Sequence, residues 1–496
     1  MEGCTMSIIG DRISKYASSH ASKLAISTTE EEVTYKELQL HIDQMQQILL
    51  SLIPDIKGKK IAFLLNHSVS WLEVFLSISG VGGIAIPLDS KWKGNQMKQV
   101  LADCNPDMVV SNDSFLGKYP ILETYSYQPV SRFYQLPKRF SQKKEVGEDD
   151  LFYIGYTSGT TGTPKGFMRT HGSWADCFSE GMKRFGLTQD DKIFCPGPLV
   201  HSHFLYASLQ ALHIGATLYV SNYFDAEDVL DRIDREEITV LYVVPTMFEA
   251  MHKMTQQYTL TSLKTLISSG AMWGKESKQK AIDLLPNVQI YEFYGASELS
   301  FVSVKDVRDE LHSEGSIGVP FQQVELSIRT ENGGEAPSEE VGELYVKSPW
   351  IFSGYLNKPE RTDEVFAGEW ATVGDLGYRD GSGNIILIGR KHNMVISGGL
   401  NIYPEEVEHV IRNHPHVEDV IVLGVEDVYW GEKVVAIYIP SQSDQLDVDE
   451  LKAHCKTELP SYKCPKNWIQ SSHFYYTSSG KVSRDKMKQR IQLAVR

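Results

Sequence analysis

Eleven consecutive residues, from Tyr156 to Gly166, constrain this chain more than any other stretch of its sequence. They read Tyr-Thr-Ser-Gly-Thr-Thr-Gly-Thr-Pro-Lys-Gly and follow Leu151–Gly155, a short apolar run that predicts a strand. The glycines let backbone N–H groups approach a ligand closely, the hydroxyls add hydrogen-bonding groups, and Lys165 supplies a charge suited to phosphate oxygens. The segment therefore predicts an anion-binding loop. It is not a Walker A loop, because that pattern ends in Gly-Lys followed by serine or threonine.

Composition narrows the classes of protein that fit this loop. The net charge is −15, which argues against general nucleic-acid binding, because such binding needs a basic surface. A small phosphate-bearing ligand needs only local positive charge. The six cysteines form no CxxC pair and no Cys/His cluster, so neither a zinc site nor a disulfide framework is expected. Reduced thiols are typical of a cytosolic enzyme.

The sequence shows no targeting or membrane segment. Glu2 and Asp11 lie near the N-terminus without an apolar run between them, so no signal peptide is expected. The most apolar long window, Val69–Leu88, is interrupted by Glu73, glycine, proline and serine, which argues against a transmembrane segment. We therefore expect a cytoplasmic protein, and a homodimer stays open.

Helical and strand-like runs alternate over residues 30–110 and again after the loop, which predicts α/β sheets with crossover helices. The polar stretch Leu116–Glu148 predicts a long connection. The predicted helices are Thr34–Ile48, Trp71–Ser79 and Ala226–Glu236. The predicted strands are Lys60–Leu65, Gly83–Leu88, Asp107–Ser111, Lys192–Cys195, Ala216–Val220, Ile238–Val244, Leu263–Ser268 and Val288–Glu292.

From about residue 315 the pattern changes to shorter, turn-rich β segments, such as Val341–Val346. A second boundary lies near Arg390–His392, and helical and strand-like runs follow it. We expect an α/β protein with a large N-terminal domain at residues 1–390, built of α/β sheets with a β-rich subdomain. A small, mobile α+β lid is expected at residues 391–496.

A second motif lies just after the strand predicted at Val288–Glu292. It reads Tyr294-Gly295-Ala296-Ser297-Glu298. The Tyr294 ring can stack on adenine, and the Ser297 hydroxyl can reach a phosphate. The Glu298 carboxylate can hold Mg²⁺ against phosphate oxygens. Two glycine-containing segments, Ser268–Ala271 and Thr372–Gly377, are weaker signals, because short segments of this kind are commonly turns.

A long string runs from Arg390 to Glu408. Its Ser397-Gly398-Gly399 permits close approach by a narrow ligand, and Pro404 begins a predicted helix at its favoured early position. Near the end of the chain, Tyr476–Val482 contains Gly480-Lys481.

Taken together and in this order, the segments resemble the motifs of the adenylate-forming superfamily, which includes acyl-CoA synthetases, luciferases and the adenylation domains of peptide synthetases. Tyr156–Gly166 resembles the signature loop of that superfamily. Tyr294–Glu298 resembles its Tyr-Gly-x-Thr-Glu motif, with Ser297 in place of threonine. Tyr476–Val482 resembles its Pro-x-Thr/Ser-x-Gly-Lys motif, with a looser match at the start. The string from Arg390 to Glu408 most resembles the CoA-ligase branch.

The resemblance implies roles for individual residues. Asp375 and Arg390 would hold the ribose, and Gly270 and Ala271 would form a wall of the adenine slot. Glu298 would bind Mg²⁺. The implied catalytic residues are Lys481, Thr161 and Glu298. The implied nucleotide-binding residues are Thr157, Ser158, Gly159, Thr160, Thr161, Gly162, Lys165, Gly270, Ala271, Tyr294, Gly295, Ser297, Asp375 and Arg390.

The lid and the acid pocket follow from the same resemblance. His392 would be the hinge, where the family usually has aspartate or lysine. The residues bordering the pantetheine channel of CoA would be Ser397, Gly398 and Gly399. The segment from Pro198 to Phe204 resembles the border of the acid pocket, with His201 and Phe204 lining it.

These features predict an ATP-dependent acid–CoA ligase that uses ATP, Mg²⁺ and CoA and forms an acyl-adenylate with release of pyrophosphate. A medium- or long-chain fatty acid is favoured over an aryl acid such as o-succinylbenzoate, and over an amino acid, because no aspartate suited to an amino group borders the pocket. The alternatives are a ligase delivering to a separate carrier protein, a luciferase-like oxygenase and a non-catalytic homologue. The intact motifs argue against the last.

Overall fold

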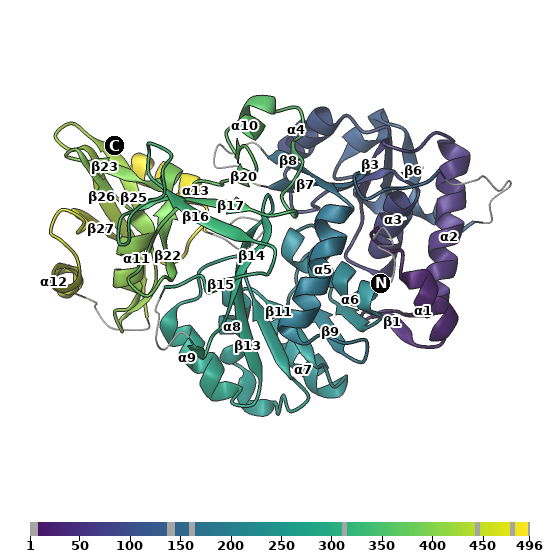
Figure 1. The fold of residues 1–496 in the computed structure, drawn as a ribbon, viewed down its shortest axis with the longest axis horizontal. Helices are drawn as coiled ribbons and strands as arrows, with labels where there is room; N and C mark the ends of the chain where they lie inside the picture. The colour runs from purple at the N-terminus through teal and green to yellow at the C-terminus, as the bar shows by residue number, and fades with distance from the viewer. Residues whose placement is uncertain are drawn as a thin grey trace.

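The computed structural model describes residues 8–135, 144–157, 164–309, 315–441, 447–476 and 482–494. Within these ranges, β-strands form four sheets, and Figure 1 shows three of them in the part of the molecule built by the first 390 residues. Among the same residues, no helix combines the length and apolar character needed to cross a bilayer.

The largest sheet has a parallel centre with antiparallel edges, and crossover helices join its parallel strands, as the alternating pattern predicts. In spatial order its strands are β15 (Val319–Pro320), β14 (Ser300–Asp306), β13 (Gln289–Ala296), β12 (Thr265–Ser268), β11 (Val240–Val243), β9 (Lys192–Cys195), β10 (Thr217–Val220), β1 (Leu24–Ser27) and β2 (Glu32–Thr34). The crossover helices are α6 (Ser202–Ile214), α7 (Ala226–Arg235), α8 (Pro245–His252) and α9 (Lys275–Leu284).

Near one edge of the second sheet, an antiparallel hairpin carries the predicted anion-binding loop. The strands of this sheet, in spatial order, are β18 (Gly354–Tyr355), β8 (Lys165–Thr170), β7 (Leu151–Thr157), β4 (Ile84–Pro87), β3 (Lys60–Leu64), β5 (Met108–Ser111) and β6 (Tyr127–Pro129). The first four helices of the chain are α1 (Ile13–Ser19), α2 (Tyr35–Leu52), α3 (Val69–Gly80) and α4 (Gly94–Cys104). A capping box starts α2, because Thr34 and Glu37 satisfy each other's backbone N–H groups.

Two helices fill the space between these sheets (Figure 1). Helix α6 packs on β9 and β10 of the first sheet, whereas α5 (Gly172–Phe185) packs on β8 of the second. Every residue of α6 from Phe204 to Ile214 is buried, as expected for a helix surrounded by protein on all sides. The two sheets therefore share one apolar core, which fixes β8 and the start of α6 relative to each other.

The third sheet is the β-rich part expected after residue 315. Its strands are β19 (Phe366–Ala367), β20 (Trp370–Ala371), β17 (Gly342–Lys347), β21 (Asp375–Arg379) and β22 (Ile385–Arg390), with β16 (Glu325–Arg329) paired to β17. The short helix α10 (Pro359–Asp363) lies next to β18 and β19.

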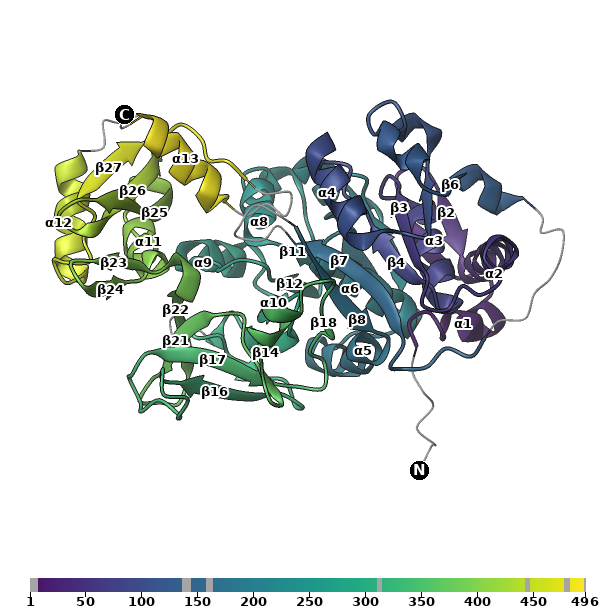
Figure 2. The same cartoon turned by 90° about the horizontal axis from the view of Figure 1, so that it is seen from above.

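The C-terminal elements gather at one end of the molecule in both views (Figures 1 and 2). They form an α+β unit, as expected for the lid. Its strands are β24 (Leu400–Ile402), β23 (Val395–Ser397), β26 (Gly431–Pro440), β25 (Val417–Asp427) and β27 (Asn467–Gln470). Its helices are α11 (Pro404–Arg412), α12 (Val448–Glu458) and α13 (Arg484–Ala494), and the short turn η6 (Lys391–Asn393) precedes it.

Two predictions about local structure need correction. The stretch Leu116–Glu148 contains the short strand β6, which pairs in parallel with β5 and so adds to the second sheet. The motif at Tyr294–Glu298 does not simply follow a strand, because β13 continues through Ala296. The antiparallel neighbour β14 supplies hydrogen-bond partners along that extension, and this pairing is not visible in a local hydrophobic pattern.

Candidate active site

A cavity of about 3380 Å³ lies between the N-terminal sheets and the C-terminal unit, and both contribute to its wall. Many predicted site residues line it, although they come from distant parts of the chain. These are Thr157, Lys165, His201, Phe204, Gly270, Ala271, Tyr294, Gly295, Ser297, Glu298, Asp375, Arg390 and His392.

The hairpin of β7 and β8 brings the two ends of the predicted anion-binding loop together. Thr157 and Lys165 are directly opposite each other in this antiparallel pair. The Lys165 ammonium lies 5.4 Å from the centre of the Tyr355 ring, within the range of a cation–π contact. The loop residues Ser158, Gly159, Thr160, Thr161 and Gly162 lie outside the described residues.

Asp375 is the centre of a buried charge cluster. The register of β21 against β22 places Asp375 opposite Arg390, whose Nε donates to Asp375 Oδ1 at 2.7 Å. The Tyr294 hydroxyl donates to the other oxygen, Oδ2. Asp375 is only 4% exposed, and its carboxylate raises the pKa of Arg390. Burial, together with this carboxylate, raises the pKa of Tyr294 well above its usual value, so Tyr294 stays a donor at neutral pH.

Gly295 allows the turn that follows Tyr294. A bulge interrupts the pairing of β13 with β14 between these two residues. A Cβ atom on Gly295 would lie 2.2 Å from the Ser300 carbonyl oxygen, so no larger residue fits without movement of the backbone. The bulge turns the next residues, Ser297 and Glu298, toward the cavity that they line.

Tyr355 positions Glu298 from a separate part of the chain. Its hydroxyl donates to Glu298 Oε1 at 2.7 Å, and the Phe352 N–H donates to the Glu298 carbonyl oxygen at 2.8 Å. Burial and the Glu298 carboxylate raise the pKa of Tyr355, which keeps its proton at neutral pH.

The surroundings of Glu298 fit Mg²⁺ held jointly with phosphates. Among the described residues, no group of three or more histidine, cysteine or carboxylate side chains is arranged to hold a metal by itself. Mg²⁺ commonly takes one or two carboxylates and completes its octahedron with substrate phosphates and water. Within the same ranges, Glu298 Oε2 accepts no hydrogen bond, which leaves it available for such a cation.

Loops at the ends of β11 and β12 form the opposite wall. Gly270 and Ala271 are exposed along the cavity just after β12 ends at Ser268. The Ser269 hydroxyl donates to the Phe293 carbonyl oxygen at 2.9 Å and so holds this loop against β13. Ser268–Ala271 therefore lies where the sequence places it, at the carboxyl end of a parallel strand.

The two histidines of the predicted acid-pocket segment differ in their surroundings. His203 makes a 3.0 Å hydrogen bond through Nε2 to the Val243 carbonyl oxygen, and burial lowers the pKa of His203 to about 4. It is therefore neutral at physiological pH and ties α6 to β11. His201, His203 and Phe204 all line the cavity.

The lid residues divide into two groups. His392, in η6, lines the cavity, whereas the described residues Ser397, Gly398 and Gly399 do not. They form the turn between β23 and β24, where Gly398 and Gly399 have φ angles of +59° and +80°. Lys481 lies outside the described residues, but its flanking residues Tyr476 and Val482 line the cavity and form a β-bridge with each other.

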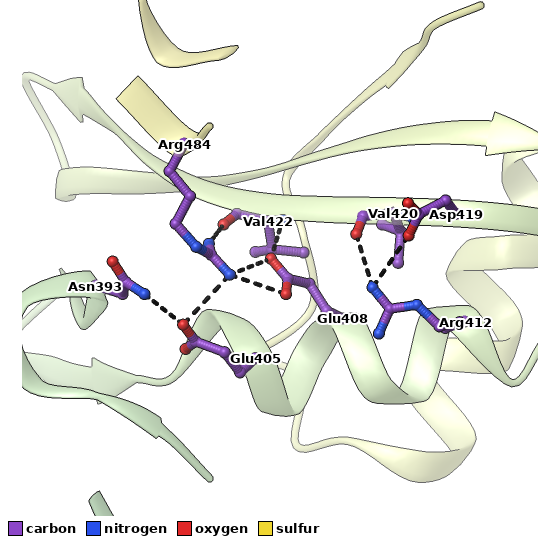
Figure 3. Close-up of polar contacts among 8 residues, drawn as sticks. All are labelled: Asn393, Glu405, Glu408, Arg412, Asp419, Val420, Val422 and Arg484. Carbon is purple, nitrogen blue, oxygen red and sulfur yellow. Dashed lines mark hydrogen bonds and ion pairs between the residues drawn. The ribbon is translucent and has the colours of Figure 1, made fainter. Parts of the chain in front are cut away.

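An arginine at the start of α13 joins three elements of the lid (Figure 3). Arg484 contacts Glu408 Oε1 and Oε2 at 2.7 and 2.9 Å and donates to the Val422 carbonyl oxygen at 2.6 Å. It also lies 3.3 Å from Glu405, which accepts from the Asn393 side chain at 2.5 Å. The network therefore connects the segment after Lys481 to α11, β25 and η6.

Replacing Arg484 with methionine is expected to destabilise the lid by about 1–3 kcal/mol, because the buried Glu408 carboxylate would lose its cation. The matched control is Arg412→Met, since Arg412 also joins α11 to β25, through Asp419 and the Val420 carbonyl at 3.1 Å each. The Arg412–Asp419 ion pair is more exposed than the Arg484–Glu408 pair, so its loss should cost no more than about 1 kcal/mol of stability. Urea unfolding measures both, and equal losses would contradict the assignment to the Arg484 network.

Sequence reasoning missed three residues that line the cavity. Ser202, at the start of α6, lies 3.1 Å from Ser297 through their hydroxyls. Tyr355 holds Glu298 but belongs to no local motif. Arg169 shares the cavity-facing side of β8 with Lys165. The only local signal for Arg169 was its charge next to the apolar residues Phe167 and Met168 of the same strand.

Comparison with known proteins agrees with this geometry. Residues 13–356 match the family model of the AMP-binding enzyme, and residues 406–481 match that of the AMP-binding enzyme C-terminal domain. The chain is 36% identical over 490 residues to an uncharacterized acyl–CoA ligase, YhfT, of Bacillus subtilis, covering 97% of this chain and 98% of the relative. It is 30% identical over 445 residues to a feruloyl-CoA synthase of an Amycolatopsis species, covering 88% and 89% of the two chains.

A solved structure is similar over nearly the whole chain. It is the o-succinylbenzoate coenzyme A synthetase MenE of Bacillus subtilis in complex with ATP and magnesium ion, with a TM-score of 0.86 and 26% identity, covering 96% of this chain and 98% of that chain. The family model alone spans well over half of the sequence. This chain belongs to the AMP-binding enzyme family, among the AMP-forming acid–CoA ligases.

Proposed function

We propose that this enzyme activates a carboxylic acid with ATP as an acyl-adenylate, releases pyrophosphate, and transfers the acyl group to CoA. The observation that carries the proposal is one shared cavity wall. It combines the Tyr294–Asp375–Arg390 cluster with Glu298 and with Lys165 at the end of the anion-binding loop. A ribose, a cation and a triphosphate need these three kinds of group.

Asp375 is proposed to accept hydrogen bonds from the ribose hydroxyls. A carboxylate offers about four acceptor positions, and Arg390 and Tyr294 occupy one each. The two donors orient the carboxylate and leave acceptor capacity toward the cavity. The exposed backbone of Gly270 and Ala271 leaves room for the adenine on the neighbouring wall.

Asp375→Asn is expected to raise the KM for ATP roughly 10- to 100-fold, because hydrogen bonds to a charged acceptor are lost. The control is the nucleotide: the natural enzyme should bind 2′-deoxy-ATP and 3′-deoxy-ATP more weakly than ATP, and the variant should hardly distinguish them. Steady-state pyrophosphate release measures both. A variant that still discriminates as strongly as the natural enzyme would rule out the ribose contact.

The first half-reaction brings two anions together, so the enzyme must screen their repulsion. The loop from Thr157 to Lys165, including Thr161, would bind the β- and γ-phosphates that leave as pyrophosphate. Lys481 would bridge the carboxylate and the α-phosphate. Mg²⁺, when bound at Glu298, would neutralise charge on the phosphate oxygens. Tyr355 would keep the Glu298 carboxylate pointed at that position.

The second half-reaction would need a different arrangement of the lid. We propose a division at residue 390, with residues 391–496 moving about His392. Such a movement would withdraw Lys481 and bring Ser397–Gly399 from outside the cavity to the acyl-adenylate. The CoA thiolate would then attack the acyl carbon, and AMP would leave. Domain movement of this kind commonly separates two steps at one site.

The class of carboxylic acid that the enzyme activates is a separate part of the proposal. The sequence favours a medium- or long-chain fatty acid, whose tail would need a long apolar lining. An aryl acid is the second candidate, because Phe167, Trp174 and Phe301 line the cavity together with the buried Arg169. A feruloyl-CoA synthase among the relatives acts on an aryl acid by its name.

A panel of carboxylic acids tests the function directly. Pyrophosphate release is measured with and without CoA, using fatty acids, ferulate, 2-succinylbenzoate and amino acids. We expect release with fatty or aryl acids and consumption of CoA thiol in step with it. If pyrophosphate release required a carrier protein and free CoA were not consumed, the acceptor would be the carrier protein and not CoA. No release with any acid would refute the proposal.

A further inference from the structure

Arg169 is a fully buried arginine in the wall of the cavity. It lies on β8 and is 0% exposed. Its Nη1 donates to the Trp350 carbonyl oxygen at 2.8 Å. Among the described residues, Nε and Nη2 of Arg169 have no hydrogen-bond partner, and no carboxylate forms an ion pair with this side chain. A buried charged donor without a partner is unfavourable, so the guanidinium has unused capacity for an acceptor.

The surroundings of Arg169 are aromatic. Its guanidinium carbon lies 5.8 Å from the centre of the Trp174 ring, and Trp174 packs edge-on against Tyr206 at 5.5 Å between ring centres. Phe167, Trp174 and Tyr206 line the same cavity. Burial lowers the pKa of Arg169 to about 10, which still leaves the side chain charged at neutral pH. A cation in such a low-dielectric environment attracts an anionic ligand group or a strong hydrogen-bond acceptor.

Another buried arginine, Arg232, makes one hydrogen bond more than Arg169, although its Nε also has no partner among the described residues. Arg232 is 1% exposed and lies between the rings of Phe194 and Tyr219, at 4.9 and 5.5 Å. Its Nη1 and Nη2 donate to two backbone carbonyl oxygens, at 2.9 and 3.4 Å. Arg232 does not line the cavity. Arg169 differs because only one of its nitrogens has a hydrogen-bond partner and because the residue lines the cavity.

The position of Arg169 along β8 relates it to the phosphate end of the cavity. Lys165, Phe167 and Arg169 alternate along the strand and all line the cavity. Four residues of strand correspond to about 13 Å. Lys165 marks the end of the anion-binding loop. Arg169 therefore occupies a different part of the cavity wall from Lys165 at the end of that loop.

We propose that Arg169 binds a second carboxylate at the far end of the acid substrate, so that the enzyme prefers dicarboxylic acids. The inference rests on the proposed adenylation of a carboxylic acid in this cavity. Nε and Nη2 form one edge of the guanidinium, which matches the two oxygens of a carboxylate. A plain fatty acid would place methylene groups against that edge and leave both donors unpaired.

Matched acids test this preference in the natural enzyme. One pair is 2-succinylbenzoate and 4-oxo-4-phenylbutanoate, which lacks only the ring carboxylate. The other is nonanedioate and its monomethyl ester. We expect at least about tenfold higher kcat/KM for the dicarboxylic member of at least one pair, measured as pyrophosphate release. If the monocarboxylic members are activated equally well or better in both pairs, the proposal for Arg169 is wrong while the adenylation function stands.

Variants then assign the preference to Arg169. Arg169→Met should reduce kcat/KM for the dicarboxylic acid and leave the monocarboxylic acid within a few-fold, which a general loss of folding would not do. Arg169→Lys should retain part of the preference and serves if the methionine variant fails to fold. The matched control, Arg232→Met, removes a buried arginine outside the cavity and should leave the ratio unchanged. An Arg169→Lys variant with an unaltered ratio, or a ratio changed equally by Arg232→Met, would overturn the assignment.

Discussion

Lys481→Ala is expected to reduce acyl-adenylate formation at least about 100-fold, because the cation that bridges two approaching anions would be removed. The same variant should still form the thioester from supplied acyl-adenylate and CoA, since that step needs no charge screening between a carboxylate and ATP. Pyrophosphate release measures the first step, and loss of free CoA thiol measures the second. The separation of the two steps is the informative result.

The control for this experiment is Lys456→Ala, an exposed lysine on α12 that does not line the cavity. It should leave both steps unchanged. If Lys481→Ala slowed both steps to the same extent, Lys481 would not be the residue specific to adenylation. On either side of the segment that carries Lys481, the described residues Tyr476 and Val482 line the cavity.

Glu298→Gln is expected to lower kcat for adenylation by about 10²–10³-fold, because a charge that holds Mg²⁺ against the phosphates would be lost. Glutamine has nearly the same shape and can still accept from the Tyr355 hydroxyl, so the variant changes charge and leaves packing intact. The Mg²⁺ concentration needed for half-maximal rate should rise. Titration of pyrophosphate release with Mg²⁺ measures both quantities.

Tyr355→Phe separates the charge of Glu298 from its orientation. It removes the 2.7 Å hydrogen bond and keeps the carboxylate, so about a tenfold loss of rate is expected, corresponding to a hydrogen bond of about 1.5 kcal/mol. The Mg²⁺ requirement should change less than in Glu298→Gln. An unaltered Mg²⁺ requirement in Glu298→Gln, despite lost activity, would move the cation site elsewhere.

Much of the fold could be predicted because its signals are local. The strand at Lys192–Cys195 has the bounds that its residue pattern predicts, and helix α7 starts at the predicted Ala226 and ends at Arg235, one residue before the predicted end. Helix α2 extends past the predicted Ile48 to Leu52 but starts at its capping box. Hydrophobic periodicity, caps and turn residues act within a few positions, so a short window of sequence contains them. The short strand β6 was missed because three residues give too little pattern.

The site could be predicted only in part. Motif residues such as Glu298, Asp375 and Arg390 were predicted and line one cavity. Tyr355 was missed, because its contact with Glu298 joins positions 57 residues apart. Arg169 was missed for a related reason: a charged residue in a strand becomes informative only when its partners, or their absence, are known.

The residues of this chain specify its elements and its reactive groups, since backbone preference and side-chain chemistry belong to short segments. Which of these groups come into contact is decided by the packing of the whole chain. The pairing of Asp375 with Arg390 depends on the register of β21 and β22, and the contact of Tyr294 with Asp375 spans 81 residues. Register and domain packing minimise a free energy summed over the entire core, which no short segment contains.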